Sequence, residues 1–124
     1  MVNKQDFLNS VNINIDMVRG DSLAFNFQLS GMGSISAYEA LGVTFSVSNE
    51  YGADAIVEVT TDNGIAVIEY DEYTDTATFV VNLIPLMTKH LDIARYYYDL
   101  QIYTDDDVLT LMRGYFTLLE EVTL

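Results

Sequence analysis

The chain has 124 residues, half of them hydrophobic, and its 19 acidic and five basic residues give a formal net charge of −14. A chain of this length buries roughly two-thirds of its unfolded surface in one core, so we expect a single domain. The negative charge repels phosphate groups and argues against binding to nucleic acid or to a membrane surface. The absence of cysteine excludes disulfides, thiolate metal sites and thiol nucleophiles.

No apolar run reaches the roughly 20 residues that a membrane-spanning helix needs, and the polar start Met1-Val2-Asn3-Lys4 does not have the pattern of a signal peptide. We therefore expect synthesis in the cytoplasm.

Residues 1–10 are polar and aperiodic apart from Phe7 and Leu8. They are interpreted as an N-terminal arm that orders against a neighbouring subunit, with Phe7 and Leu8 as the residues it would bury. Residues 11–124 are predicted to form the folded domain. Its nine tyrosines and six phenylalanines, beside a single proline, favour strands over helices.

Apolar and polar residues alternate over residues 11–18 and again over 23–29, and the two segments are separated by Arg19-Gly20-Asp21. Alternation with period two is typical of half-buried strands, and Gly20 suits a tight turn. The pattern predicts a β-hairpin, with the Arg-Gly-Asp sequence as its turn and not as a cell-adhesion motif. The Gly- and Ser-rich residues 30–40 are predicted to be a loop between two sheets.

Further strands are predicted at residues 41–47, 56–60, 65–70, 77–83, 95–103 and 108–122. Asp62-Asn63-Gly64 predicts a tight turn, because Asn-Gly tolerates positive φ. Pro85 and the apolar spacing over residues 85–92 predict one short helix. Seven to eight antiparallel strands with one short helix indicate an all-β, immunoglobulin-like sandwich.

The segment Tyr96-Tyr97-Tyr98-Asp99 lies in one of these strands. Alternation places Tyr96 and Tyr98 in the core, and it places Tyr97 and Tyr103 on the outside. Exposed tyrosines suit contacts with proteins or sugars. The candidate interface residues are therefore Phe7, Leu8, Tyr97 and Tyr103.

The sequence offers no basis for catalysis. His90 is the only histidine, no serine-centred nucleophile motif is present, and no carboxylate pair stands out. Two acidic clusters, Asp71-Glu72 with Asp75 and Asp105–Asp107, could supply oxygen ligands to calcium, but aspartate is also a common turn residue. They are interpreted as solvated turns, and no catalytic, cofactor or metal site is predicted.

Three segments resemble the immunoglobulin-like N-terminal domain of tailed-phage baseplate upper proteins and related virion proteins. They are residues 16–27 around Arg-Gly-Asp, residues 95–102 around Tyr-Tyr-Tyr-Asp, and residues 109–123 around Arg113-Gly114-Tyr115-Phe116. The resemblance covers nearly the whole chain from residue 11. It implies that the Arg-Gly-Asp turn opens the first hairpin and that the tyrosine strand pairs with the Gly114 strand.

The resemblance further implies a structural role in a tail, baseplate, neck or head-decoration assembly, without catalytic residues. The expected function is thus that of a non-enzymatic bacteriophage virion protein, present in several copies and bound to other virion proteins. The alternative is a receptor- or carbohydrate-binding module that uses Tyr97, Tyr103 and the acidic turns, with calcium as an optional ligand.

Overall fold

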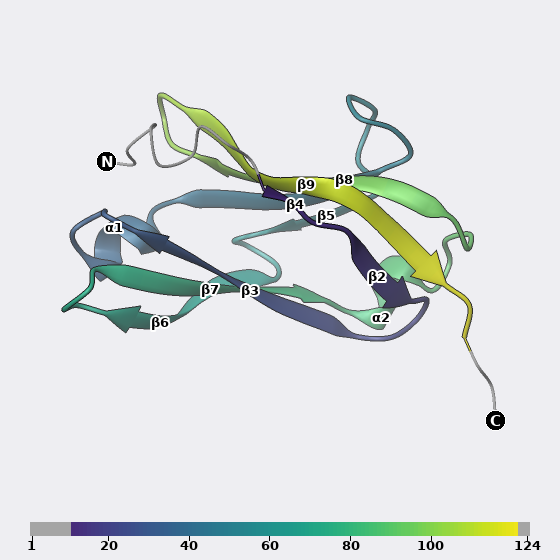
Figure 1. Cartoon of the computed structure of the whole chain (residues 1–124), viewed down its shortest axis with the longest axis horizontal. Coiled ribbons are helices and arrows are strands. Elements are labelled where there is room, and N and C mark those ends of the chain that lie inside the picture. The colour runs from purple at the N-terminus through teal and green to yellow at the C-terminus, as the bar shows by residue number, and fades with distance from the viewer. Residues whose placement is uncertain (1–10, 122–124) are drawn as a thin grey trace.

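The computed structural model describes residues 11–121, which form two β-sheets stacked as two layers (Figure 1). The larger sheet has the strand order β1-β9-β8-β4-β5, and β2 also pairs with β9. Its strands are β1 (Val11–Asn12), β2 (Ile15–Val18), β4 (Gly42–Ser48), β5 (Val57–Thr60), β8 (Arg95–Tyr103) and β9 (Val108–Leu119).

The smaller sheet has the order β3-β7-β6, formed by β3 (Leu23–Ser30), β7 (Thr76–Leu83) and β6 (Ile65–Asp71). These three strands and the β4-β8-β9 group correspond in order to the B-E-D and C-F-G strands of immunoglobulin domains. The all-β sandwich predicted from the sequence is confirmed. No helix in the described part of the chain has the length and apolar character needed to cross a membrane.

The core fills the space between the two sheets. Inward-facing residues alternate along β4, β7 and β8, which makes every second side chain of these strands buried. Phe45 lies at the centre, where its ring contacts Phe25, Tyr98 and Phe116 at centroid distances of 5.5, 5.3 and 6.2 Å. Edge-to-face and tilted aromatic pairs of this kind stabilise the packing of one sheet on the other.

The predicted hairpin between residues 11–18 and 23–29 is wrong. Residues 11–18 form two strands, β1 and β2, that both run parallel to β9 in the larger sheet, whereas β3 pairs with β7 in the smaller sheet. The Arg19-Gly20-Asp21 turn therefore carries the chain from one layer to the other. The prediction that all strands are antiparallel is also wrong, because β1 and β2 pair with β9 in parallel.

Gly114 lies where the segment 11–18 is divided into β1 and β2. Ile13 and Asn14 cross directly over this glycine, where Ile13 N–H donates to Arg113 O at 3.1 Å and Asn14 Oδ1 accepts from Tyr115 N–H at 3.1 Å. The buried Tyr98 hydroxyl also donates to Ile13 O. The segment is thus fixed against β9 by contacts that are distant in sequence.

The loop predicted for residues 30–40 contains a helix, α1 (Ile35–Glu39), so the described chain has two short helices where one was predicted. Ser34 caps α1 by accepting a hydrogen bond from Ala37 N–H, and Tyr38 anchors it in the core. The predicted helix over residues 85–92 is shorter than expected. It spans α2 (Pro85–Thr88), whose last residue, Thr88, is fully buried.

The Asp62-Asn63-Gly64 turn is present but does not close a hairpin, because β5 and β6 belong to different sheets. Neither Asn63 nor Gly64 has a positive φ. The Asn63 side chain instead accepts a hydrogen bond from Thr60 N–H at 2.7 Å, which shapes the turn.

Asp75 joins the β6–β7 turn to the start of α1. Its carboxylate accepts hydrogen bonds from the hydroxyls of Tyr38 and Tyr70, each at 3.1 Å, and from Gly33 N–H at 2.8 Å. Partial burial raises the pKa of Asp75, but these hydrogen bonds together hold the pKa below its usual value. Asp75 also adopts a left-handed φ of 51°.

We expect Asp75→Asn to lose stability at neutral pH, with a deficit that shrinks as the pH falls. A carboxylate whose folded pKa lies below its ordinary value of 3.8 stabilises the fold above that pH, and this contribution disappears as the pH falls through the folded pKa. Urea midpoints measured from about pH 6 to pH 2 test this. Asp106→Asn, in an exposed turn, controls for the loss of one charge. A deficit independent of pH would contradict the assignment.

Candidate interaction surface

The outer face of the larger sheet carries tyrosine, arginine and aspartate side chains on β8 and β9. On β8, Tyr96 and Tyr98 are buried as predicted, and Tyr97 and Tyr103 point outward, also as predicted. Tyr97 lies opposite Tyr115 of β9 in the antiparallel register, and Asp99 lies opposite Arg113. The outer face of this strand pair therefore combines aromatic rings with charges of both signs.

Three tyrosines and two arginines form a continuous row of side chains in contact, which we call the arginine–tyrosine ladder. Tyr97 lies between Tyr51 and Tyr115, with ring centroids 4.6 and 5.3 Å away. Arg113 caps one end at 4.7 Å from the Tyr51 ring, and Arg95 caps the other at 4.6 Å from the Tyr115 ring. Cation–π contacts at these distances attract the guanidinium groups to the faces of the rings.

Tyr51 reaches the ladder from the loop between β4 and β5. Gly52 has a φ of +84°, and Ala53 N–H donates to Glu50 O at 3.2 Å, so the chain turns sharply after Tyr51. The Tyr51 hydroxyl then donates to Gly114 O at 3.1 Å on β9. This loop is thus folded over the sheet and places the third ring beside the two rings supplied by strands.

The ladder is exposed to solvent, and contacts between its side chains hold them in place. The exposed fractions of Tyr51 and Tyr115 are 44% and 38%, and Tyr97 is half-buried between them. Each ring packs against a neighbouring ring and the two end rings also contact an arginine, so their positions are fixed before any partner arrives. Rings that are already ordered lose little conformational entropy when they bind.

A polar groove runs alongside the ladder. It has a volume of about 330 Å³, and Asp99, Tyr51 and Gln101 are among its lining residues. Burial raises the pKa of Asp99, and the charge of Arg113 offsets part of this effect. The remaining lining residues are Ser46, Ser48, Gly52, Ala53, Asp54, Ala55, Glu58 and Tyr98.

Tyr103 does not belong to the ladder. It lies six residues beyond Tyr97 on β8, a separation of about 20 Å along a strand. Its ring covers Gly42 of β4 and is 40% exposed. It lines a separate cavity of about 480 Å³ near α1, together with Met32, Ala37, Glu39, Ala40, Leu41, Gly42, Thr61, Thr104 and Asp105. The other two predicted interface residues, Phe7 and Leu8, lie outside the described residues.

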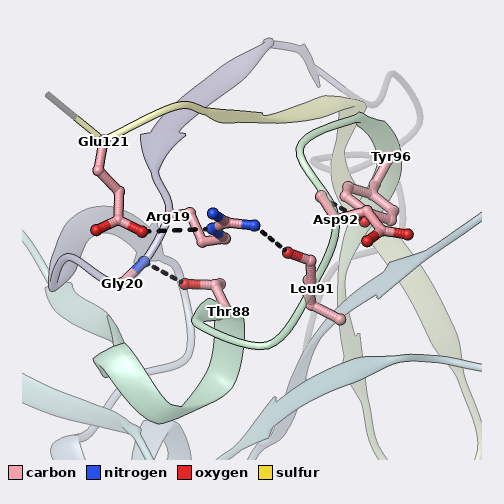
Figure 2. Close-up of polar contacts among 7 residues, drawn as sticks. All are labelled: Arg19, Gly20, Thr88, Leu91, Asp92, Tyr96 and Glu121. Atoms are coloured by element: carbon pink, nitrogen blue, oxygen red, sulfur yellow. Dashed lines mark hydrogen bonds and ion pairs between the residues drawn. The ribbon is translucent and has the colours of Figure 1, made fainter.

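The Arg19-Gly20-Asp21 turn is held by contacts within the domain (Figure 2). Arg19 Nη1 donates to Leu91 O at 3.1 Å, and its Nε lies 3.5 Å from Glu121 Oε1. Gly20 N–H donates to the buried Thr88 hydroxyl at 3.1 Å. The interpretation of this motif as a turn is confirmed, although the turn connects two sheets and not two strands of a hairpin.

In the first acidic turn, the carboxylates of Asp71 and Asp75 have roles in the fold. Asp71 Oδ1 accepts from Tyr73 N–H at 2.9 Å, and Asp75 has the partners described above. Within residues 11–121, no group of three or more His, Cys, Asp or Glu side chains is placed to hold a metal ion. His90 is exposed just after α2.

Comparisons with known proteins relate the chain to others by fold. No protein-family model and no curated protein sequence matches it. Among solved structures, it is similar to a family 123 glycoside hydrolase from Clostridium perfringens, described in relation to glycolipid glycan hydrolysis, with a TM-score of 0.56 and 16% identity. The match covers 96% of this chain and 25% of that one, so the present chain spans about a quarter of the hydrolase's length. The similarity supports the β-sandwich fold.

Sequence reasoning found Tyr97 but missed the other four members of the ladder. Arg95 and Tyr115 occupy the outward positions of their strands, and the Tyr97–Tyr115 pairing follows from the register of β8 with β9. Alternation along each strand could have placed Arg95, Arg113 and Tyr115 on the outer face, but it does not give the register that brings them beside Tyr97. Tyr51 had no such signal, because its position depends on how its loop folds over β9.

Proposed function

We propose that the protein is a non-enzymatic virion structural protein that binds a neighbouring protein through the outer face of its larger sheet. The observation that carries this proposal is the arginine–tyrosine ladder, in which the tilted rings of Tyr51, Tyr97 and Tyr115 pack in a row between Arg95 and Arg113. Tyrosine and arginine are enriched among the residues that dominate protein–protein binding energy.

The charge distribution adds to this argument. The chain has five basic residues in total, and two of them lie in the ladder. Elsewhere the acidic excess discourages close approach by acidic proteins, whereas here guanidinium groups and tyrosine hydroxyls offer hydrogen-bond donors. The ladder is thus suited to a protein surface with aromatic rings and carbonyl or carboxylate acceptors.

The assignment to a phage virion rests on the resemblance of residues 16–27, 95–102 and 109–123 to baseplate-type immunoglobulin-like domains. In such an assembly, one rigid domain repeated around a symmetry axis presents the same face to each neighbour. Tail, baseplate, neck and head-decoration positions all fit this mode of binding.

Mass spectrometry of particles purified from the encoding phage tests the virion assignment. We expect the protein at a fixed ratio to the major capsid or tail protein, corresponding to several copies per particle. If the protein is made during infection but is absent from washed particles, the assignment is wrong.

A glycan-binding module is the second candidate, favoured by the polar groove beside Tyr51. Asp99, Gln101 and Glu58 supply hydrogen-bonding groups next to an exposed ring, and sugars combine stacking with such polar contacts. A glycan array probed with the wild type and with Tyr51→Ala tests this candidate. Binding that the variant loses would support it, and repeating the array with a chelator would reveal any need for calcium.

A further inference from the structure

We propose that β3 is a self-association edge, through which two copies of the chain join their smaller sheets by antiparallel β3–β3 pairing. This inference uses a different surface from the arginine–tyrosine ladder and does not rest on the proposed function. It is carried by the exposure of β3, by its lack of charge and by the symmetry of its sequence.

Within residues 11–121, β3 pairs with β7 on one side and with no strand on the other. Along these eight residues, Leu23–Ser30, every second residue bonds to β7, and the backbone donors and acceptors of the others face the free side of the strand. A long free edge of this kind is a template for pairing with another chain.

The other sheet edges carry features that discourage pairing. β5 has four residues and includes the exposed Glu58, and β6 has Glu69 and Asp71 with a register shift after Val67. The β1–β2 edge is interrupted, and Asp16 is exposed there. Short length, bulges and charge are the usual protections of edge strands, and β3 has none of them.

The lack of charge at β3 is unusual in this protein. Residues 22–38 contain no charged side chain, although the chain as a whole carries a net charge of −14. Two copies repel one another over most of their surface, and β3 is a place where they can approach without opposing carboxylates. This favours a second copy as the occupant of the edge.

The side chains of β3 also leave apolar surface for a partner to cover. Leu23, Phe25 and Phe27 face the core, yet each is only partly buried. Phe27 stacks on Phe79 at 4.9 Å and Phe25 contacts Phe45, so both rings are held in place at the open side of the sandwich. An added strand would cover these rings as well as the backbone.

The sequence of β3 is nearly palindromic about Asn26: Leu23-Ala24-Phe25-Asn26-Phe27-Gln28-Leu29. In an antiparallel pair centred on Asn26, Phe25 of one copy lies opposite Phe27 of the other, and Leu23 lies opposite Leu29. Asn26 then faces its own copy on the outer side, where it is exposed. Aromatic cross-strand pairs stabilise sheets, and a two-fold interface requires this kind of self-complementarity.

Cysteine cross-linking tests the register, because the wild type contains no cysteine. In the proposed dimer, Asn26→Cys places two thiols directly opposite, within the Cα separation of about 4.4–6.8 Å that a disulfide needs. Gln28→Cys is the matched control on the same exposed face. Its two copies would lie about 13 Å apart along the strands, too far for a disulfide.

We expect Asn26→Cys to form a covalent dimer under mild oxidation and Gln28→Cys to remain monomeric on a denaturing gel. Absence of the Asn26→Cys dimer, or equal cross-linking of both variants, would overturn the proposed register. Native mass spectrometry and sedimentation of the wild type should in parallel detect a concentration-dependent dimer.

Charge repulsion gives a second, independent test. Asn26→Asp would place two carboxylates together at the two-fold axis, and we expect it to weaken dimerisation by at least about tenfold. Asn82→Asp adds the same charge on the same face of β7, away from the edge, and should dimerise like the wild type. A wild type that stays monomeric, or a dimer unaffected by Asn26→Asp, would refute the β3 interface without affecting the ladder.

Discussion

Replacing Gly114 by alanine is expected to lower the free energy of unfolding by about 2–3 kcal/mol and to loosen β1 and β2. A Cβ at this position would overlap the carbonyl oxygen of Ile13, which is backbone and cannot move aside like a flexible side chain. Moving Ile13 away would break its hydrogen bond to Arg113 O and separate it from the Tyr98 hydroxyl. Urea denaturation and hydrogen exchange of residues 11–18 measure the two effects.

Gly52→Ala is the matched control for this substitution. Gly52 has a positive φ of 84° but no atom within 4 Å of an added Cβ, so its replacement should cost about 1–2 kcal/mol of left-handed strain. Exchange in residues 11–18 should remain unchanged in this control. If Gly114→Ala keeps the stability and the hydrogen exchange of the wild type, the crossing of Ile13 over Gly114 is not a tight contact.

Tyr97→Ala is expected to produce the largest loss of binding, because Tyr97 is the central ring of the ladder. Its removal leaves Tyr51 and Tyr115 without the ring that both of them contact, so neither side chain is held in place on that side. Central aromatic residues of interfaces typically cost about 2–4 kcal/mol on truncation, roughly 30-fold to 1000-fold in affinity. In particles assembled with the variant, we expect the number of incorporated copies to fall at least about tenfold.

Two further variants show whether reduced incorporation comes from lost binding or from lost folding. Tyr97→Phe keeps the ring and should retain most of the incorporation. Tyr73→Ala removes a tyrosine that is 93% exposed in the β6–β7 turn, far from the ladder in the fold, and should incorporate normally. If Tyr97→Ala is folded and incorporates as well as Tyr73→Ala, the ladder is not the binding surface.

The fold class could be predicted because alternation depends on nearest neighbours in the sequence. The pattern of β8 assigned Tyr96 and Tyr98 to the core and Tyr97 to the surface, and the structure confirms each assignment. The same pattern could not reveal which strands pair. Residues 11–18 and 23–29 alternate as two strands of a hairpin would, yet contacts with Gly114 and Arg113 hold the first segment in the opposite sheet.

The helix α1 and the ladder were missed for a related reason. A Gly- and Ser-rich segment is typical of loops, and α1 depends on Tyr38, whose hydroxyl donates to the distant Asp75. Ser34 as an N-cap was a local signal that could have suggested this helix. The ladder joins Tyr51, Tyr97 and Tyr115, which are brought together by a folded loop and by strand register.

Hydroxyl-radical footprinting of tyrosines, compared between the free protein and assembled particles, tests the contact surface most directly. Tyr51 and Tyr115 are exposed in the free domain, and Tyr73 provides an internal reference at 93% exposure. We predict that Tyr51 and Tyr115 lose most of their reactivity on assembly while Tyr73 remains reactive. Unchanged reactivity of Tyr51 and Tyr115 in particles that contain the protein would contradict binding through the outer face of the larger sheet.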